Sequence, residues 1–158
     1  MPTTKPNPGK LAVILLADDD PGDQELTRRA LEEDVLRVDL RIVSDGEEAL
    51  DYLFCRGPYA APGAAPRPDL ILLDLNMPRM NGREVLQTLK KSSDLCRIPV
   101  VILTTSQQEA DILATYNLGC NSYVQKPVDI ERFIKVVREM GNYWFEVVTL
   151  PRCGTLSA

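Results

Sequence analysis

Five apolar runs alternate along the chain with stretches of helical periodicity. The longest, 11–17, consists only of Leu, Ile, Val and Ala, a pattern that is typical of strands buried on both faces. The runs cover residues 11–17, 38–43, 70–75, 99–104 and 122–125. Such alternation predicts a parallel sheet with right-handed crossovers. Five units in about 130 residues fit an open, doubly wound α/β sheet between two layers of helices, because a barrel needs about eight.

Capping signals mark the starts of the helices. Asp20 precedes Pro21, which places a capping carboxylate before a proline at the first helical position. Ser-x-x-Glu segments at 44–47 and 106–109 have the spacing of a capping box, and Asp129 predicts the cap of the last helix. The first predicted helix begins at Pro21. The other four cover about residues 44–54, 82–92, 106–119 and 129–140.

The chain divides into a short leader (1–10), one domain (11–141) and an extension (142–158). The leader contains prolines but no apolar core, so it does not resemble a signal peptide. Within the domain, residues 57–68 hold four prolines, two glycines and four alanines. This composition predicts an irregular insertion before the third strand.

Composition narrows the function classes. The chain has 158 residues, with 18 Lys and Arg against 23 Asp and Glu, and its formal charge of −5 argues against direct binding to nucleic acid. It has no His, which excludes Ser-His-Asp and Cys-His catalysis and His-containing zinc sites. Its four cysteines form no Cys-x-x-Cys and predict reduced thiols in a cytoplasmic protein. The longest apolar run, 11–17, is too short to cross a membrane.

Polar side chains stand at the ends of four predicted strands. The acidic triplet 18–20 follows the first strand and Asp74 ends the third, while Thr104 and Lys126 close the fourth and fifth. Because the carboxyl ends of parallel strands meet at one edge of the sheet, these groups are expected to converge. Clustered carboxylates repel one another, and oxygen ligands without His or Cys select a hard cation such as Mg²⁺ or Mn²⁺. Taken alone, the triplet also fits a solvated, capped helix start.

The order of these motifs resembles that of the receiver domain of two-component response regulators. The motifs are Asp18-Asp19, Leu72-Leu-Asp74-Leu-Asn76-Met-Pro78, Gly82, Thr104 and Lys126-Pro127. The resemblance covers about residues 11–141 and implies a flavodoxin-like sheet of strand order 2-1-3-4-5. The insertion and the aromatic extension are similar to those of single-domain regulators associated with cyanobacterial and bacterial phytochromes.

The resemblance implies a role for each acidic residue. Asp74 would accept a phosphoryl group from the histidine of a sensor kinase, here one of the phytochrome type. Asp19 and Asp74 would bind Mg²⁺ or Mn²⁺ together with the main-chain carbonyl of Asn76. Asp18 would bind the metal through water or shape the site. Phosphoryl transfer needs charge neutralisation and positioning, and little other chemistry from the protein.

Thr104 and Lys126 would contact the phosphoryl oxygens, and Tyr123 occupies the family's switch position. Thr104 would move toward the phosphoryl group and Tyr123 would turn inward, which changes the surface of the fourth helix, fifth strand and fifth helix. The protein would be a signalling switch rather than an enzyme, and would promote its own phosphorylation and dephosphorylation. By its pattern alone, Tyr123 also fits an ordinary half-buried strand aromatic. The family further implies a cis bond between Lys126 and Pro127.

Three alternatives differ in class from a phosphoacceptor. A phosphohydrolase with a nucleophilic Asp usually carries a second Asp two residues later, where this chain has Asn76. A nucleotide- or flavin-binding module needs a Gly-rich loop after the first strand, where the triplet 18–20 would repel phosphate. A Mg²⁺-binding pseudo-receiver, which binds partners without phosphotransfer, is compatible with every motif.

The extension bears on output and assembly. About seventeen residues follow the last helix, so we expect a stand-alone receiver whose output passes through a downstream protein or a phosphotransfer partner. Positions 143–150 include six large apolar residues, too many for a solvated tail. They either fold back onto the domain or form a homodimer, for which the candidates are Tyr143, Trp144, Phe145 and Val147.

Overall fold

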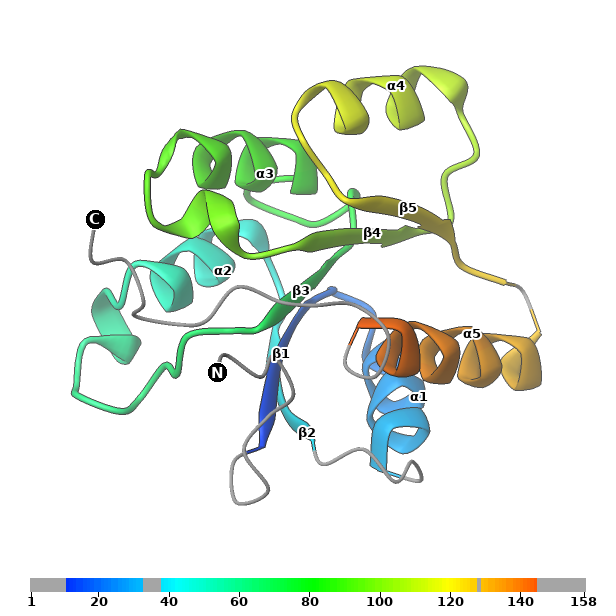
Figure 1. Cartoon of the computed structure of the whole chain (residues 1–158), viewed down its shortest axis with the longest axis horizontal. Helices are drawn as coiled ribbons and strands as arrows, with labels where there is room; N and C mark the ends of the chain where they lie inside the picture. The colour runs from blue at the N-terminus through cyan, green and yellow to red at the C-terminus, as the bar shows by residue number, and fades with distance from the viewer. Residues whose placement is uncertain (1–10, 33–37, 128, 145–158) are drawn as a thin grey trace, which may run out of the picture.

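The computed structural model describes residues 11–32, 38–127 and 129–144. Its centre is a five-stranded parallel sheet in the order β2-β1-β3-β4-β5 (Figure 1). The strands are β1 (Ala12–Ala17), β2 (Val38–Val43), β3 (Leu70–Leu73), β4 (Val100–Thr104) and β5 (Ser122–Gln125). The strands and their order confirm the predicted flavodoxin-like, doubly wound fold.

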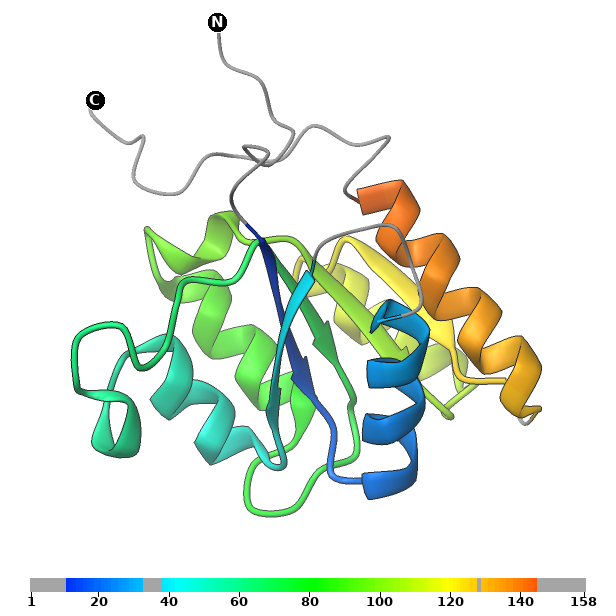
Figure 2. The ribbon, with the colours of Figure 1, turned by 90° about the horizontal axis from the view of Figure 1, so that it is seen from below.

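Five helices cover both faces of this sheet. They are α1 (Pro21–Glu32), α2 (Gly46–Leu53), α3 (Gly82–Lys91), α4 (Glu109–Asn117) and α5 (Ile130–Asn142). Helices α1 and α5 lie on one face, and α2, α3 and α4 lie on the other (Figure 2). In β1, Leu15 and Ala17 face the core under α2 and α3, whereas Ile14 and Leu16 face the core under α1 and α5. Burial on both faces explains the continuous apolar runs.

The Pro-rich insertion packs against α2 through two tyrosines. The Tyr52 hydroxyl donates to the Pro66 carbonyl at 2.8 Å, and the Tyr59 hydroxyl donates to the Glu48 carboxylate at 2.9 Å. The two rings meet edge to face, with centroids 5.1 Å apart. The insertion also contains the short 3₁₀ helix η1 (Gly57–Tyr59). The segment is therefore largely irregular, as predicted, but it is held to the domain.

Three helix caps involve Asp. Asp20 and Asp129 cap α1 and α5 as predicted, at 2.8 Å and 3.1 Å from main-chain N–H groups of the first turn. In α2 the capping residue is Asp45, whose carboxylate accepts from the Glu48 N–H at 2.8 Å. The Glu48 carboxylate accepts in turn from the Ser44 N–H at 2.7 Å. The predicted capping box of Ser44 and Glu47 is therefore wrong: Asp45 caps the helix and Glu48 bonds the residue before the cap, because an Asp carboxylate caps as well as a Ser hydroxyl.

The capping box predicted at 106–109 is wrong. Gln108 stands at the start of α4, and its side chain makes no capping hydrogen bond. The Ser106 hydroxyl donates to the carboxylate of Asp111, in the first turn of α4, at 2.7 Å and accepts from the Gln108 N–H at 3.3 Å, so its partners differ from the Glu109 N–H that a capping box requires. The end of α4 agrees with the prediction, since Gly119 follows it with a φ of +97°, a conformation that favours glycine.

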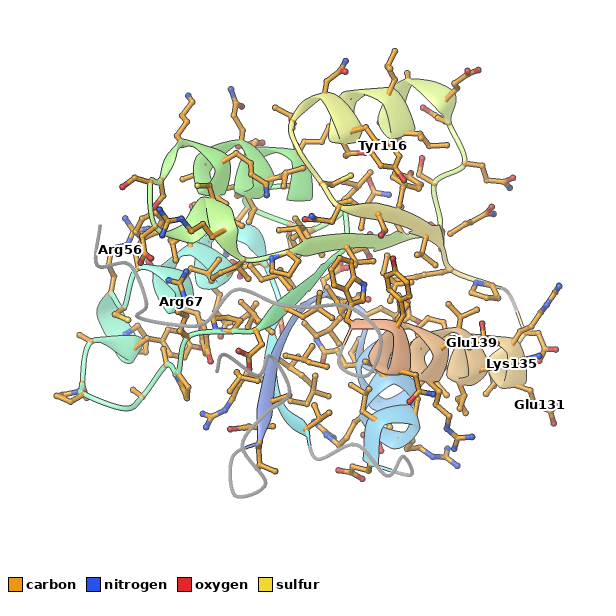
Figure 3. All side chains as sticks on the ribbon, in the orientation of Figure 1. Arg56, Arg67, Tyr116, Glu131, Lys135 and Glu139 are labelled. Carbon is orange, nitrogen blue, oxygen red and sulfur yellow. The ribbon has the colours of Figure 1, made fainter. Side chains whose placement is uncertain are left out.

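α4 is less buried than the other helices. Of its residues, all of which the structure describes, only Thr115 is buried, and Leu113 and Tyr116 are 61% and 48% exposed. Tyr116 lies over β5 (Figure 3), where its hydroxyl accepts from the Tyr123 N–H at 3.2 Å. Polar contacts therefore contribute more than an apolar face to holding α4 on the domain.

α5 is amphipathic, with charged side chains on its outer face. Glu131, Lys135 and Glu139 point away from the sheet (Figure 3), at the four-residue spacing that puts side chains on one side of a helix. Phe133 and Val137 lie on the opposite side and belong to the core that α5 shares with α1. This helix runs two residues further than the predicted end.

The first residues of the extension lie against the domain. Trp144 is 8% exposed and packs into the core between α1, α5 and the sheet, whereas Tyr143 is 52% exposed. Phe145 and Val147 lie outside the described residues, and the dimer stays a prediction. Within the part of the chain that the structure describes, no helix has the length and apolarity that crossing a bilayer requires.

Candidate functional site

Three carboxylates meet where β1 and β3 end. These strands pair in parallel with Ala17 opposite Leu73, so the residues that follow them are neighbours. One carboxylate oxygen from each of Asp18, Asp19 and Asp74 lies within 4.8 Å of the others. We call these three residues the acidic cluster. Asp18 and Asp74 are buried, while Asp19 is exposed, so the cluster opens to solvent on one side.

A buried ammonium group faces the acidic cluster. The Lys126 Nζ lies 2.6 Å from Asp18, 2.9 Å from Asp74 and 2.8 Å from Asp23. Lys126 follows the edge strand β5, and its long side chain reaches the end of β3 across β4. The first two contacts agree with the predicted convergence. Asp23, in the first turn of α1, is a site residue that the sequence analysis missed.

Burial and charge oppose each other at this site. Burial raises the pKa of Asp18 to about 6, although hydrogen bonds from Lys126 and from the Asp20 N–H act in the other direction. For Lys126, burial acts to lower the pKa, but hydrogen bonds to Asp18 and Asp23 and the attraction of Asp74 outweigh it, and the pKa is raised. Lys126 is therefore a permanent cation, whereas Asp18 is costly to ionise until a second cation arrives.

This pKa gives a pH dependence. Because the folded pKa of Asp18, about 6, exceeds the unfolded value of 3.8, the fold binds this proton more tightly, and stability falls as the pH rises through this window. The cost at neutral pH is at most about 3 kcal/mol. In EDTA, we expect the melting temperature of Asp18→Asn minus that of the wild type to become more positive between about pH 5 and about pH 8. Thermal unfolding at each pH measures this difference in melting temperature, with Asp51→Asn on α2 as the control. A difference between Asp18→Asn and the wild type that does not change with pH would contradict the prediction.

Thr104 presents an unused hydroxyl to the site. It is the last residue of β4 and is fully buried, yet its Oγ1 has no hydrogen-bond partner among the described residues. A buried hydroxyl without a partner costs about 1–3 kcal/mol. Such a group is retained where an incoming ligand oxygen can satisfy it. Thr104 therefore has the position and the free hydrogen-bonding capacity that its predicted role requires.

The loop after Asp74 is packed without spare room. The Asn76 N–H donates to Asp74 Oδ1 at 3.2 Å, and the Gly82 N–H donates to the Leu75 carbonyl at 2.9 Å. A Cβ on Gly82 would overlap the Asp74 carbonyl oxygen and come within 2.9 Å of the Leu75 Cα. Only glycine allows α3 to start this close to the end of β3. Arg79, at a φ of +66°, makes the turn between them.

Tyr123 connects β5 to the segment between β4 and α4. It is half-buried, and its hydroxyl donates to the Ser106 carbonyl at 2.9 Å. The Ser106 hydroxyl binds Asp111, which also forms an ion pair with Arg83 of α3. These contacts border an open cleft of about 700 Å³ that reaches Asn76. The switch role of Tyr123 stays a prediction.

One implied feature is corrected. The described residues contain no cis peptide bond, so the bond between Lys126 and Pro127 is trans. Trans is the isomer that X-Pro bonds prefer by about 0.5–1 kcal/mol. The Lys126 side chain makes all three of its carboxylate contacts with the bond in this form.

The fold and this site define a class of protein. Residues 14–138 match the model of the response regulator receiver domain, and the chain belongs to that family. It is 43% identical over 145 residues to Response regulator Rcp1 of Synechocystis sp., a match that covers 92% of this chain and 95% of Rcp1.

Two solved structures show the same likeness in three dimensions. The Mn²⁺-bound form of response regulator Rcp1 is similar with a TM-score of 0.84 and 42% identity, over 89% of this chain and 99% of the other. The phosphorylated cyanobacterial phytochrome response regulator RcpA is similar with a TM-score of 0.85 and 39% identity, over 90% and 100%. In this chain, the carboxylate donors of the acidic cluster fit a hard divalent cation.

Proposed function

We propose that this protein is a response regulator in which Asp74 accepts a phosphoryl group from a sensor histidine kinase. The observation that carries the proposal is the set of groups around one carboxylate. Lys126 contacts Asp74 at 2.9 Å, the unpaired Thr104 hydroxyl closes the neighbouring strand, and the acidic cluster fits a divalent cation. A structural ion pair needs neither the orphan hydroxyl nor the excess of carboxylates.

The chemistry follows from these positions. A carboxylate oxygen of Asp74 attacks phosphorus, a P–O bond forms, the P–N bond to the kinase imidazole breaks, and the imidazole nitrogen keeps the electron pair. The acidic cluster and the Asn76 main-chain carbonyl would hold Mg²⁺ or Mn²⁺, which would supply positive charge to the phosphoryl oxygens. Lys126 binds one of these oxygens and Thr104 donates a hydrogen bond to another. The protein contributes positioning and charge, as phosphoryl transfer requires.

The switch uses the same residues. The phosphoryl group adds about one negative charge at Asp74, and the Thr104 hydroxyl gains a partner by moving toward it. Tyr123 then leaves the Ser106 carbonyl and turns into the space that Thr104 vacates. The surface of α4, β5 and α5 changes as a result, and a downstream protein or phosphotransfer partner reads it. Hydrolysis of the aspartyl phosphate at the same site resets the switch.

Partner and assembly are part of the proposal. Similarity to RcpA, a phytochrome response regulator, supports a kinase of the phytochrome type. The extension would form a homodimer contact around the exposed Tyr143, while Trp144 stays packed on its own domain. The free thiols of Cys55, Cys96 and Cys120 support a cytoplasmic location, where thiols remain reduced.

The test is formation of a phosphoryl adduct. Wild-type protein is incubated with acetyl phosphate and Mg²⁺ and followed by intact mass. We expect an acid-stable, base-labile adduct that maps to the peptide containing Asp74 and does not form in EDTA. No adduct despite measurable Mg²⁺ binding would contradict phosphotransfer and favour a pseudo-receiver. An adduct on another peptide would move the acceptor away from Asp74.

A further inference from the structure

The ammonium of Lys126 uses all three of its N–H groups on carboxylates. Asp18 lies at 2.6 Å, Asp23 at 2.8 Å and Asp74 at 2.9 Å. They come from three separate elements, namely the segment after β1, helix α1 and the end of β3. The Lys126 side chain is 4% exposed, so water does not compete freely for these donors. Each N–H direction is therefore set by the protein.

Asp23 differs from the other two carboxylates. Among the described residues, the group that could share a cation consists of Asp18, Asp19 and Asp74, and Asp23 is outside it. Its side chain is 22% exposed and points at Lys126. Its backbone belongs to α1, where its carbonyl accepts from the Thr27 hydroxyl at 2.8 Å. Asp23 is thus fixed by a helix and has Lys126 as its neighbour of opposite charge.

Geometry gives this contact a use. The N–H bonds of an ammonium have fixed mutual angles, so two occupied directions determine the third. A lysine side chain is otherwise flexible, with a four-carbon stem. Contacts to Asp18 and Asp23 therefore aim the remaining N–H at Asp74. A phosphoryl oxygen would replace the Asp74 oxygen as a partner of Lys126, and a metal would compete with Lys126 for Asp18. Asp23 would then remain the carboxylate that contacts Lys126 and binds neither the metal nor the phosphoryl group.

We propose that Asp23 is a positioning residue for phosphoryl transfer, which keeps the Lys126 ammonium directed at Asp74 and at the phosphoryl group that arrives there. This inference rests on the proposed function. Asp23 touches neither the reacting oxygen nor phosphorus, and it acts through Lys126. Misplacing a catalytic group by about 1 Å can cost a factor of about 100 in rate, so loss of one of two anchors is expected to slow transfer measurably.

The experiment compares Asp23→Ala with Asp23→Asn. Labelling by acetyl phosphate at saturating Mg²⁺ is followed by intact mass. Because the amide oxygen of Asn can still accept from Lys126, we expect Asp23→Asn to label within about threefold of the wild-type rate and Asp23→Ala about tenfold more slowly. Glu25→Gln, which removes a charge from the same helix without contacting Lys126, is expected to label at the wild-type rate. Melting temperatures confirm that each variant is folded.

A double-mutant cycle separates positioning from a structural role. In a Lys126→Met background, Asp23→Ala is expected to cause no further loss, because its effect passes through the missing ammonium. Three results would each overturn the inference. Asp23→Ala could label at the wild-type rate, or both Asp23 variants could be slowed equally. Asp23→Ala could also slow labelling in the Lys126→Met background by the same factor as in the wild type. If both Asp23 variants labelled faster than the wild type, Asp23 would be competing with the phosphoryl group for Lys126, and the inference would be overturned too. If the wild type itself takes no phosphoryl group, the proposed function fails instead.

Discussion

Asp74→Asn is expected to eliminate the stable phosphoryl adduct while leaving the fold intact. An amide is a very poor nucleophile, so the labelling rate should fall by at least about 100-fold, to the background of the assay. Asn has the same shape as Asp, and its single oxygen can keep one of the two hydrogen bonds that Asp74 accepts, from the Asn76 N–H to Oδ1 at 3.2 Å or from Lys126 to Oδ2 at 2.9 Å. The substitution also removes one of several like charges from a buried site, so we expect no loss of stability.

Intact mass after incubation with acetyl phosphate and Mg²⁺ measures this effect, and thermal unfolding reports on the fold. Asp51→Asn is the matched control, because it makes the same chemical change on α2, where Asp51 forms an exposed ion pair with Arg56. The control should label at the wild-type rate. Labelling of Asp74→Asn at that rate would show that another residue accepts the phosphoryl group, and peptide mapping would then locate it.

Gly82→Ala is expected to destabilise the protein by about 2–3 kcal/mol, the usual cost of overpacking a closed site. The added methyl group would overlap the Asp74 carbonyl oxygen and crowd the Leu75 Cα. Both neighbours are backbone atoms, which cannot turn away as the end of a side chain can. Relief would require α3 to shift away from β3, and this shift would move Asp74 itself. We therefore expect slower phosphoryl labelling in addition to the lower stability.

Urea unfolding gives the change in free energy, and Gly22→Ala is its control. Gly22 lies in the first turn of α1, as Gly82 lies in that of α3, but the nearest atom to an added Cβ is a flexible carboxylate oxygen of Asp20 at 3.2 Å. Ala is a better helix former than Gly by up to about 1 kcal/mol, so the control should be neutral or slightly stabilising. Equal stability of the two variants would contradict the packing argument at Gly82.

Most of the fold and the centre of the site could be predicted from the sequence because they follow from the geometry of a parallel sheet. Continuous apolar runs predicted the central strands of the sheet. The residues that follow parallel strands at their carboxyl ends then lie along one edge of the sheet. Asp74, Thr104 and Lys126 could be placed in this way before any contact was known. The family resemblance supplied the strand order and the roles, which the apolar pattern alone does not contain.

The rest depends on contacts between side chains that are distant in sequence. Asp23 and Lys126 are 103 positions apart, and an acidic residue in the first turn of a helix is already accounted for by the helix dipole. Nothing in the pattern set Asp23 apart from other such residues. Similarly, the capping box predicted at 106–109 does not form, because the Ser106 hydroxyl bonds the Asp111 carboxylate and the Gln108 N–H instead. The burial of Trp144 likewise depends on how α1 and α5 pack on the sheet, which the apolar pattern does not contain.

The low burial of α4 determines how little free energy is needed to move this helix. Since Thr115 is the one buried residue of this helix, displacing α4 exposes little apolar surface and its contacts can be exchanged for hydrogen bonds with water. Local opening of such an element requires far less free energy than global unfolding. One charge-assisted hydrogen bond, worth about 1.5–3 kcal/mol, is then enough to redistribute the conformers of α4. We therefore expect the proposed switch to move α4 while the rest of the core keeps its packing.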